Sequence, residues 1–227
     1  RRGLLESDLT IGICLVDMYA KCDMVTRAQQ VFDEIRTRTV VLWTSLISGY
    51  AEHGPYSEAV RCFEQMQQEG ISPNIVTLIS ILKAYGGLGD ANEIEKIYVE
   101  IEKKGLFEGN LIIGNTLVNA YAKCGCLEEA QSVFNNMEVH CVVSWNSLLA
   151  GYAEHGLGQE VLDCLERLQM EGLYPNMVTY VISLKSCGFI GALVLGQELH
   201  VEVTKIGLEN ELLISTSLVD FYAKVGA

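Results

Sequence analysis

Cysteine, histidine and acidic side chains are the groups with which this chain could carry out catalysis or hold a metal. It has eight cysteines and four histidines among 227 residues. His140 and Cys141 are adjacent, which prevents them from taking the usual roles of base and nucleophile. The chain contains no Cys-x-x-Cys, His-Glu-x-x-His, Gly-x-Ser-x-Gly or phosphate-binding glycine loop. We therefore predict neither an enzyme nor a cofactor in these residues.

The cysteines could also form disulfides, but their placement favours free thiols. Cys22 and Cys124 recur at one place in a repeated phrase, where we expect a small residue packed at a helix end. The others are scattered: Cys14, Cys62, Cys126, Cys141, Cys164 and Cys187. A free cysteine behaves as a small buried hydrophobe. This interpretation implies a reducing compartment.

The elements that must position any functional residue are repeated. The stretch 41–54, Val-Leu-Trp-Thr-Ser-Leu-Ile-Ser-Gly-Tyr-Ala-Glu-His-Gly, returns in close variation at 143–156. Likewise 15–22, Leu-Val-Asp-Met-Tyr-Ala-Lys-Cys, returns at 117–124 and again at 218–224. A fixed period indicates a modular array, which favours a long binding surface over a single pocket. The Glu-His pairs that end the first phrase are periodic too, so we interpret them as helix-end residues.

Glycine, proline and the apolar period divide the chain into repeats. The predicted boundaries are 9–39, 40–74, 75–110, 111–141, 142–176 and 177–211, with 1–8 as the tail of a preceding repeat and 212–227 as part of another. Within 40–74, one helix should bury Trp43, Leu46, Ile47 and Tyr50, and a second should bury Ala59, Phe63 and Met66. Left-handed glycines should end the first helices, at Gly54, Gly89, Gly125, Gly156 and Gly191, and Asp23 takes that place once.

A helical hairpin cannot bury its apolar face alone, whereas stacked hairpins share a continuous core. We therefore predict an all-α, right-handed superhelical solenoid of two-helix repeats. The sequence starts inside one repeat and stops inside another, so we expect a fragment whose targeting segment lies elsewhere. Uncovered apolar faces at its ends predict possible self-association.

Composition limits the function classes. The chain is 49% hydrophobic, yet no run of about 18 apolar residues occurs, so we predict no membrane span. No signal or transit peptide is present in these residues. The formal net charge of −13 has the wrong sign for bulk attraction to nucleic acid, because phosphate contacts supply most non-specific affinity.

The repeat phrases distinguish between two helical-repeat families. Tetratricopeptide repeats share the Ala-x-x-x-Phe pair found at Ala59 and Phe63, but they open with Trp-x-x-Leu-Gly-x-x-Tyr. Here the openings are Val-Val-x-Trp-(Thr/Asn)-Ser-Leu-(Ile/Leu)-x-Gly-Tyr or a close variant, and the closings are Gly-(Ile/Leu)-x-Pro-Asn. The chain resembles pentatricopeptide repeat proteins over essentially its whole length. The alternating repeat lengths resemble those of the plant organellar PLS subgroup. In this resemblance 9–39, 111–141 and, in part, 212–227 are S repeats, and 40–74 and 142–176 are P repeats. The L repeats are 75–110 and 177–211, and residues 1–8 resemble the tail of another L repeat.

The resemblance implies single-stranded RNA binding at one base per repeat, chosen by the fifth and last residues. Thr44 with Asn74 resembles the pair that prefers adenine, and Asn146 with Asn176 resembles the pair that prefers cytosine, then uracil. Asn115 implies a pyrimidine, although its partner Cys141 is not a usual code residue, and Thr216 implies a purine with its partner beyond the chain. Ile13, Ile79 and Val181 cannot hydrogen-bond a base. The implied target is 5′-N-A-N-Y-Y-N-R-3′.

The resemblance also implies a second set of contacts. Second residues of the repeats would wedge against base faces, namely Val41, Val76, Ile112, Val143, Val178 and Leu213, with Thr10 the non-aliphatic exception; plain core packing is the alternative. Lys21, Lys123 and Lys224 are candidate phosphate contacts, or else cations placed by the helix dipole. Glu52 and Glu154 hold that place in the P repeats and would repel phosphate.

Three functions stay open at this point. The chain could be the RNA-targeting part of a mitochondrial or chloroplast RNA editing or processing factor, with other such factors as partners. It could belong to an editing enzyme, although the His-x-Glu and Pro-Cys-x-x-Cys of the family's zinc deaminase domain are absent here. The acidic balance favours a third function, a protein-interaction scaffold of tetratricopeptide type.

Overall fold

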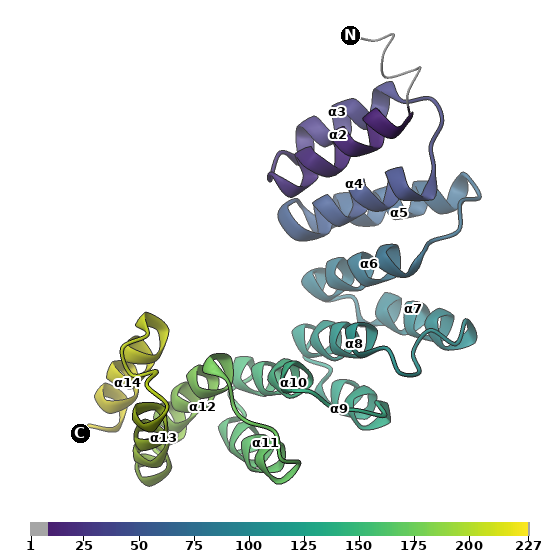
Figure 1. Cartoon of the computed structure of the whole chain (residues 1–227). Helices are drawn as coiled ribbons and strands as arrows, with labels where there is room; N and C mark the ends of the chain where they lie inside the picture. The colour runs from purple at the N-terminus through teal and green to yellow at the C-terminus, as the bar shows by residue number, and fades with distance from the viewer. Residues whose placement is uncertain (1–8, 227) are drawn as a thin grey trace. The chain divides into compact units, whose positions relative to one another are not determined.

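The computed structural model describes residues 9–226, and all regular elements in that part of the chain are α-helices (Figure 1). The N-terminal helices are α2 (Leu9–Lys21), α3 (Val25–Glu34), α4 (Val40–His53), α5 (Tyr56–Gln68), α6 (Ile75–Leu88) and α7 (Ala91–Lys103). The C-terminal helices are α8 (Leu111–Lys123), α9 (Leu127–Asn136), α10 (Val142–Glu154), α11 (Gly158–Met170), α12 (Met177–Ile190), α13 (Leu193–Lys205) and α14 (Leu212–Val225). Even-numbered helices begin at the first residues of the predicted repeats.

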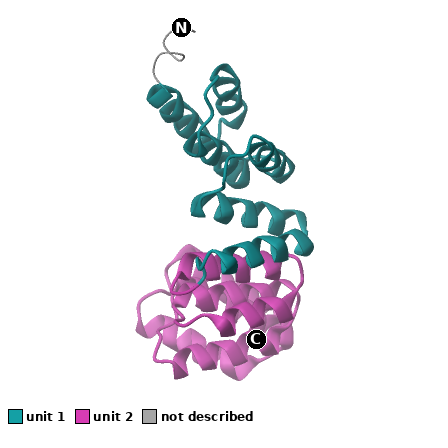
Figure 2. Cartoon of the chain, turned by 90° about the vertical axis from the view of Figure 1, so that its right-hand side faces the viewer, with its two compact units in different colours: residues 1–107 teal, residues 108–227 magenta. Residues whose placement is uncertain are grey.

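The chain divides into two compact units, residues 1–107 and 108–227 (Figure 2). In the first unit, α4 packs between α2 and α6, and α5 packs against both α4 and α6. In the second unit, α10 packs between α8 and α12, and α12 also contacts α14. Each unit is thus a stack of helical hairpins whose first helices form one continuous row. The all-α helical-repeat prediction is confirmed.

Glycine allows the first helices to approach closely. A Cβ added to Gly49 of α4 would lie 2.6 Å from the Cβ of Ala20 on α2. The equivalent Gly151 of α10 would meet Ala122 on α8 at the same distance. A methyl group at either place would push the two helices apart. The glycine in the Gly-Tyr of the repeated phrase is therefore explained by packing.

Aromatic residues fill the core between the first helix of one repeat and the second helix of the repeat before it. Trp43 is fully buried, and its ring meets Phe32 edge-on with the centroids 4.5 Å apart. Trp145 and Phe134 repeat this contact at 4.6 Å. The residues predicted to be buried in 40–74 are all in the core: Trp43, Leu46, Ile47, Tyr50, Ala59, Phe63 and Met66.

The helix-end predictions are correct with one exception. The glycines at 89, 125, 156 and 191 are left-handed, and Asp23 also adopts a positive φ of 59°. Gly54 is not left-handed, because its φ is −107° and its ψ is −175°. Pro55 follows it, and a residue before proline is driven into the extended region. Its counterpart Gly156 precedes a leucine and has a φ of 73°.

The cysteines are free thiols, but not all are buried. Burial raises the pKa of Cys62 to about 12, and the pKa values of Cys164 and Cys187 to about 11. The packing predicted for Cys22 is wrong, because it lies exposed in the turn after α2, and Cys124 is only partly buried. Within residues 9–226 no cluster of three metal-binding side chains occurs, and no helix is long and apolar enough to cross a membrane.

Candidate nucleic-acid interface

The fifth and last residues of the repeat 40–74 lie together in the first unit. Thr44 is on α4, and Asn74 is the N-cap of α6, where its Oδ1 accepts from the backbone N–H of Thr77 at 2.9 Å. The hydroxyl of Thr77 lies 3.0 Å from the same Oδ1 and 2.7 Å from the hydroxyl of Thr44. Asn74 and Thr44 are thus connected through Thr77, a buried residue of the following repeat.

The hydrogen bonds within this set determine which donor and acceptor groups of Thr44 and Asn74 remain free for a ligand. The Thr44 hydroxyl can donate its single proton to the Val40 carbonyl, 2.7 Å away, or to the Thr77 hydroxyl. Either bond directs that proton into the protein, so Thr44 presents a lone pair. Asn74 Oδ1 is occupied by the helix cap, which leaves the Nδ2 group to donate. The set therefore offers one acceptor beside one donor group.

In the second unit, the fifth and last residues of the repeat 142–176 also lie together, but they leave different groups free for a ligand. Asn146 of α10 donates from Nδ2 to Oδ1 of Asn176, 3.0 Å away, and Asn176 caps α12 through the Thr179 N–H at 3.1 Å. The Thr179 hydroxyl lies 2.7 Å from Asn146 Oδ1 and 3.1 Å from Asn176 Oδ1, and we assign its single proton to the nearer oxygen. Both amide oxygens are occupied, and the free N–H groups of Asn146 and Asn176 remain. This set offers donors only.

The repeat 111–141 brings its two residues together less well. Asn115 Nδ2 is 4.0 Å from the sulfur of Cys141, and Asn115 Oδ1 is buried without a hydrogen-bond partner. Partial burial raises the pKa of the Cys141 thiol, but hydrogen bonds from Ser144, Val143 and Asn115 outweigh it and leave the pKa below its ordinary value. Cys141 thus places a thiol with a lowered pKa where the repeats 40–74 and 142–176 place an asparagine.

The remaining fifth residues, as far as the structure describes them, form no such hydrogen-bonded set with the last residue of their repeat. Thr216 is exposed on α14, and its hydroxyl donates to the Leu212 carbonyl at 2.7 Å. Ile13, Ile79 and Val181 are partly buried aliphatic residues. Val181 packs against the core formed by α11, α12, α13 and α14.

The second residues of the repeats are exposed, which argues against core packing as their explanation. The exposed fractions are 49% for Val41 and Val76, 65% for Ile112, 57% for Val143 and 48% for Val178. Leu213 is 57% exposed as well. Aliphatic side chains one turn before the fifth residue are thus open to a ligand.

The candidate phosphate lysines differ in their surroundings. Lys21 and Lys224 form ion pairs with Asp17 and Asp220 on their own helices, at 2.7 and 2.6 Å. Lys224 Nζ also lies 3.9 Å from the centre of the Phe189 ring. Lys123 is exposed at the end of α8 and forms no ion pair with a described residue, so its charge is available.

Lys83 was not singled out from the sequence, yet it changes the charge pattern. It is on α6 and forms an ion pair with Glu52 of α4. The carboxylate expected to repel phosphate is therefore neutralised by a lysine of the next repeat. Lys185 follows Glu154 by the same 31 residues, and this repeated spacing is the sequence signal that could have drawn attention to Lys83.

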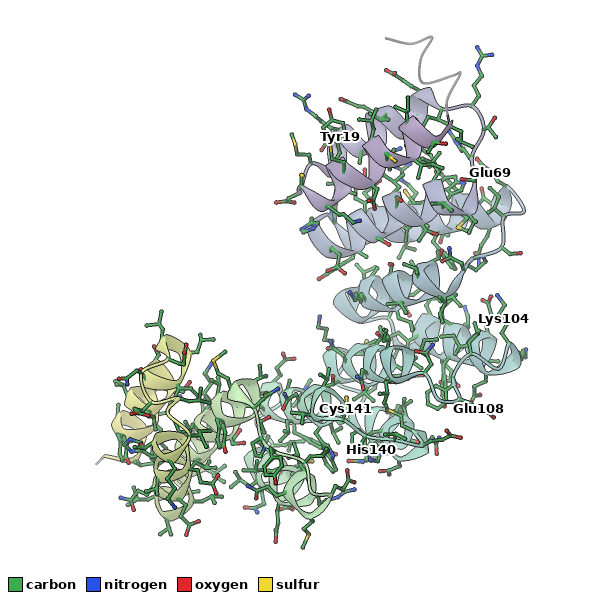
Figure 3. The ribbon with its side chains drawn as sticks, viewed as in Figure 1. Tyr19, Glu69, Lys104, Glu108, His140 and Cys141 are labelled. Atoms are coloured by element: carbon green, nitrogen blue, oxygen red, sulfur yellow. The ribbon has the colours of Figure 1, made fainter. Side chains whose placement is uncertain are left out.

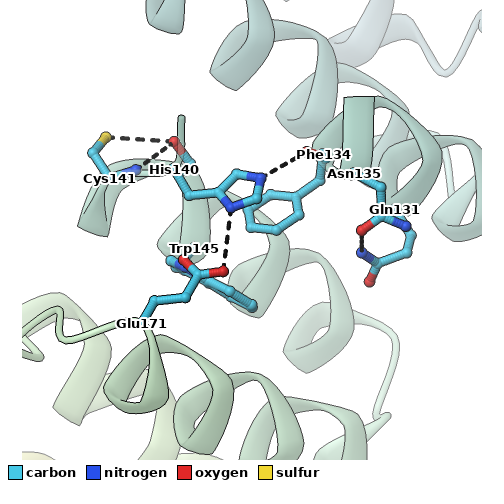
Figure 4. A network of polar contacts seen from close by, with 8 residues as sticks. Gln131, Phe134, Asn135, His140, Cys141, Trp145 and Glu171 are labelled. Carbon is cyan, nitrogen blue, oxygen red and sulfur yellow. Dashed lines mark hydrogen bonds and ion pairs between the residues drawn. The ribbon is translucent and has the colours of Figure 1, made fainter. Parts of the chain in front are cut away.

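His140 and Cys141 lie in the segment between α9 and α10 (Figure 3), and a network of polar contacts holds this segment in place (Figure 4). Glu171 accepts from Trp145 Nε1 at 2.9 Å and lies 3.3 Å from His140 Nδ1, whose ring stacks on Phe134 with centroids 4.1 Å apart. His140 Nε2 faces the Phe134 carbonyl at 2.9 Å. In the first unit Arg38, Trp43 and Glu69 make the matching contacts. His140 is thus a structural residue.

Comparison with known sequences identifies the repeats. Sequence profiles of the PPR repeat match most of the chain: the PPR repeat family at 38–87 and 140–188, and the PPR repeat at 14–40, 76–106 and 115–142. A chloroplastic pentatricopeptide repeat-containing protein of Arabidopsis thaliana is 34% identical over 99% of this chain and 36% of its own length. A mitochondrial one from the same plant is 33% identical over 98% of this chain and 33% of its length. The chain spans about a third of the curated relatives it matches.

Solved structures agree in fold. The pentatricopeptide repeat protein PPR10, in complex with an 18-nt psaJ RNA element, superposes with a TM-score of 0.74 at 23% identity, covering 91% of this chain and 31% of that one. PPR10 from maize gives a TM-score of 0.66 at the same identity, over 94% of this chain and 30% of that one. The repeated phrases, the stacked hairpins and the profile matches together place this chain in the pentatricopeptide repeat family.

Proposed function

We propose that this chain is a sequence-specific, single-stranded RNA-binding array that reads one base per repeat. The single observation that carries this proposal is the hydrogen bonding of the two P repeats, which leaves different groups free at equivalent places. An acceptor beside a donor, as at Thr44 and Asn74, complements the amino group and ring nitrogen of an adenine edge. Donors alone, as at Asn146 and Asn176, suit the ring nitrogen and carbonyl of cytosine or the carbonyls of uracil.

The P, L and S assignment gives the array its register. The proposed target is 5′-N-A-N-Y-Y-N-R-3′, where the adenine faces 40–74, one pyrimidine faces Asn115 and Cys141, and the next faces 142–176. The exposed second residues would separate successive bases by contacting their faces. Because relatives are named chloroplastic or mitochondrial, we place the whole protein in one of these organelles, as an RNA editing or processing factor that works with other such factors.

A direct titration tests the proposal. Labelled RNA with the target spacing, the same RNA with the A and Y bases exchanged, and the matching DNA are titrated against the chain at low and physiological salt. Tighter binding of the first supports base reading in this register. The charge of −13 is what favours the protein-interaction scaffold. Equal binding of all three, or none at low salt, would favour that scaffold. Light scattering on the same samples reports any self-association.

We expect Lys123→Ala to weaken RNA binding without changing base preference. The free ammonium group of Lys123 would contact a phosphate, and each such contact contributes about 0.7 to the slope of log affinity against log salt for single strands. The salt slope should fall by about that amount. Lys96→Ala is the control, since it removes an equal charge from α7, where Lys96 pairs with Glu93. Equal slopes for Lys123→Ala and wild type would exclude the contact.

The alkylation rate of the Cys141 thiol provides a second test of RNA binding. A lowered pKa means more thiolate at pH 7, so iodoacetamide should alkylate Cys141 well before the buried thiols of Cys62, Cys164 and Cys187. Bound target RNA should slow alkylation of Cys141, as followed residue by residue by peptide mass spectrometry. Cys126, at the start of α9, is the internal control whose rate should not change. If RNA is bound and Cys141 still reacts at its free rate, no base lies against it.

A further inference from the structure

A third residue belongs to each base-reading set, and it comes from the next repeat. Thr77 and Thr179 are the third residues of α6 and α12, and both are fully buried. Each contacts the fifth and the last residue of the repeat before it through its hydroxyl, and also bonds the last residue through its backbone N–H. This inference rests on the proposed function of the P repeats.

We propose that Thr77 and Thr179 are positioning residues that set the base preference of the preceding repeat. At 142–176, the Thr179 hydroxyl donates to Asn146 Oδ1, and the Thr179 N–H holds Asn176 Oδ1 in place to accept from Asn146 Nδ2. Rotating the Asn146 amide by 180° would place two amide oxygens 3.0 Å apart, where they repel. The threonine thus fixes which end of the amide remains for a base.

The helix-capping hydrogen bonds between Thr179 and Asn176 further restrict the orientation of the base-reading side chains. Thr179 Oγ1 also accepts from the backbone N–H of Asn176 at 3.2 Å, so the two residues form a reciprocal capping box. The backbone of Asn176 and the amide of Asn146 are therefore oriented by one side chain. In the first unit the Thr77 hydroxyl lies within hydrogen-bond distance of both the Thr44 hydroxyl and Asn74 Oδ1, so it holds the fifth and last residues of that repeat in place relative to each other.

The repeat 111–141 shows the result when this contact is missing. Ser144 takes the equivalent place on α10, but its hydroxyl bonds the N–H and sulfur of Cys141, at 3.2 and 3.4 Å. No hydrogen bond joins it to Asn115 among the described residues, and Asn115 Oδ1 is left buried without a partner. The amide of Asn115 is therefore held only through the distant sulfur.

Thr179→Val and Thr179→Ser test the proposal. Valine keeps the shape of threonine and lacks the hydroxyl, whereas serine retains it. RNAs carrying each of the four bases opposite 142–176 are titrated against both variants and wild type. We expect valine to reduce the preference for cytosine over purines about tenfold, since one discriminating polar contact has that size, and serine to preserve it. The adenine preference opposite 40–74 should stay unchanged.

The outcomes separate the two proposals. If wild type itself shows no base preference, the proposed function fails. If wild type prefers a pyrimidine and Thr179→Val keeps that ratio, or weakens all four RNAs equally, the positioning role is wrong and the threonine only caps a helix. Thr77→Val repeats the test in the first unit should Thr179→Val not fold. Without RNA, the side-chain NMR signals of Asn146 should broaden in Thr179→Val but not in Thr179→Ser; unchanged signals would also overturn the role.

Discussion

Thr44→Asn is expected to move the base preference of repeat 40–74 from adenine to a pyrimidine. Asn74 and Thr77 already match Asn176 and Thr179, so the variant rebuilds the donor-only set of the second unit. The new amide would direct its oxygen to Thr77 and one N–H to Asn74, which removes the acceptor that adenine needs. Reading contacts of this kind contribute about 1–3 kcal/mol, so the ratio of cytosine to adenine affinity should rise at least about fivefold.

The measurement is a competition titration with RNAs that differ only at the base opposite 40–74. Asn146→Thr provides the reciprocal control, since it should give adenine preference opposite 142–176. In each single variant the unchanged repeat should keep its preference. A Thr44→Asn protein that is folded, binds RNA and still prefers adenine would show that this repeat does not read that base.

Trp145→Ala should cause the largest loss of stability. Truncating a fully buried aromatic residue costs about 3–5 kcal/mol, through lost burial and the cavity left behind. Trp145 has no exposed surface, meets Phe134 edge-on, and donates to Glu171. Without it, Glu171 loses the hydrogen bond from the indole N–H, and the stacked rings of His140 and Phe134 lose the indole that packs edge-on against both.

Urea unfolding followed by circular dichroism gives the free energy of unfolding. Trp43 then remains as the only tryptophan and reports on the first unit by its fluorescence. The matched control is Met170→Ala, which truncates a side chain that is 77% exposed in the same repeat and should change stability little. A loss below about 1 kcal/mol for Trp145→Ala would mean that the core of this repeat is not packed as described.

The repeats, their helices and their buried faces follow from the sequence alone. The spacing of Trp43, Leu46, Ile47 and Tyr50 determines which face of α4 is buried, because a helix brings those positions to one side. Helix ends are similarly local, and even the error at Gly54 has a local cause in Pro55. The fifth and last residues could be named as candidates in advance because the repeats resemble pentatricopeptide repeats, and the resemblance assigns base reading to those two places.

The tertiary structure alone decided how those residues are bonded. Thr179 reaches Asn146 across 33 residues, and Lys83 reaches Glu52 across 31, so neither contact is visible in a local pattern. Both depend on how closely one first helix packs on the next. The same packing left Asn115 Oδ1 without a partner, and Cys22 is exposed although the repeated phrase predicted that it packs at a helix end. Hydrogen bonds require atomic positions within a few tenths of an ångström, and a repeat pattern fixes only which face each residue occupies.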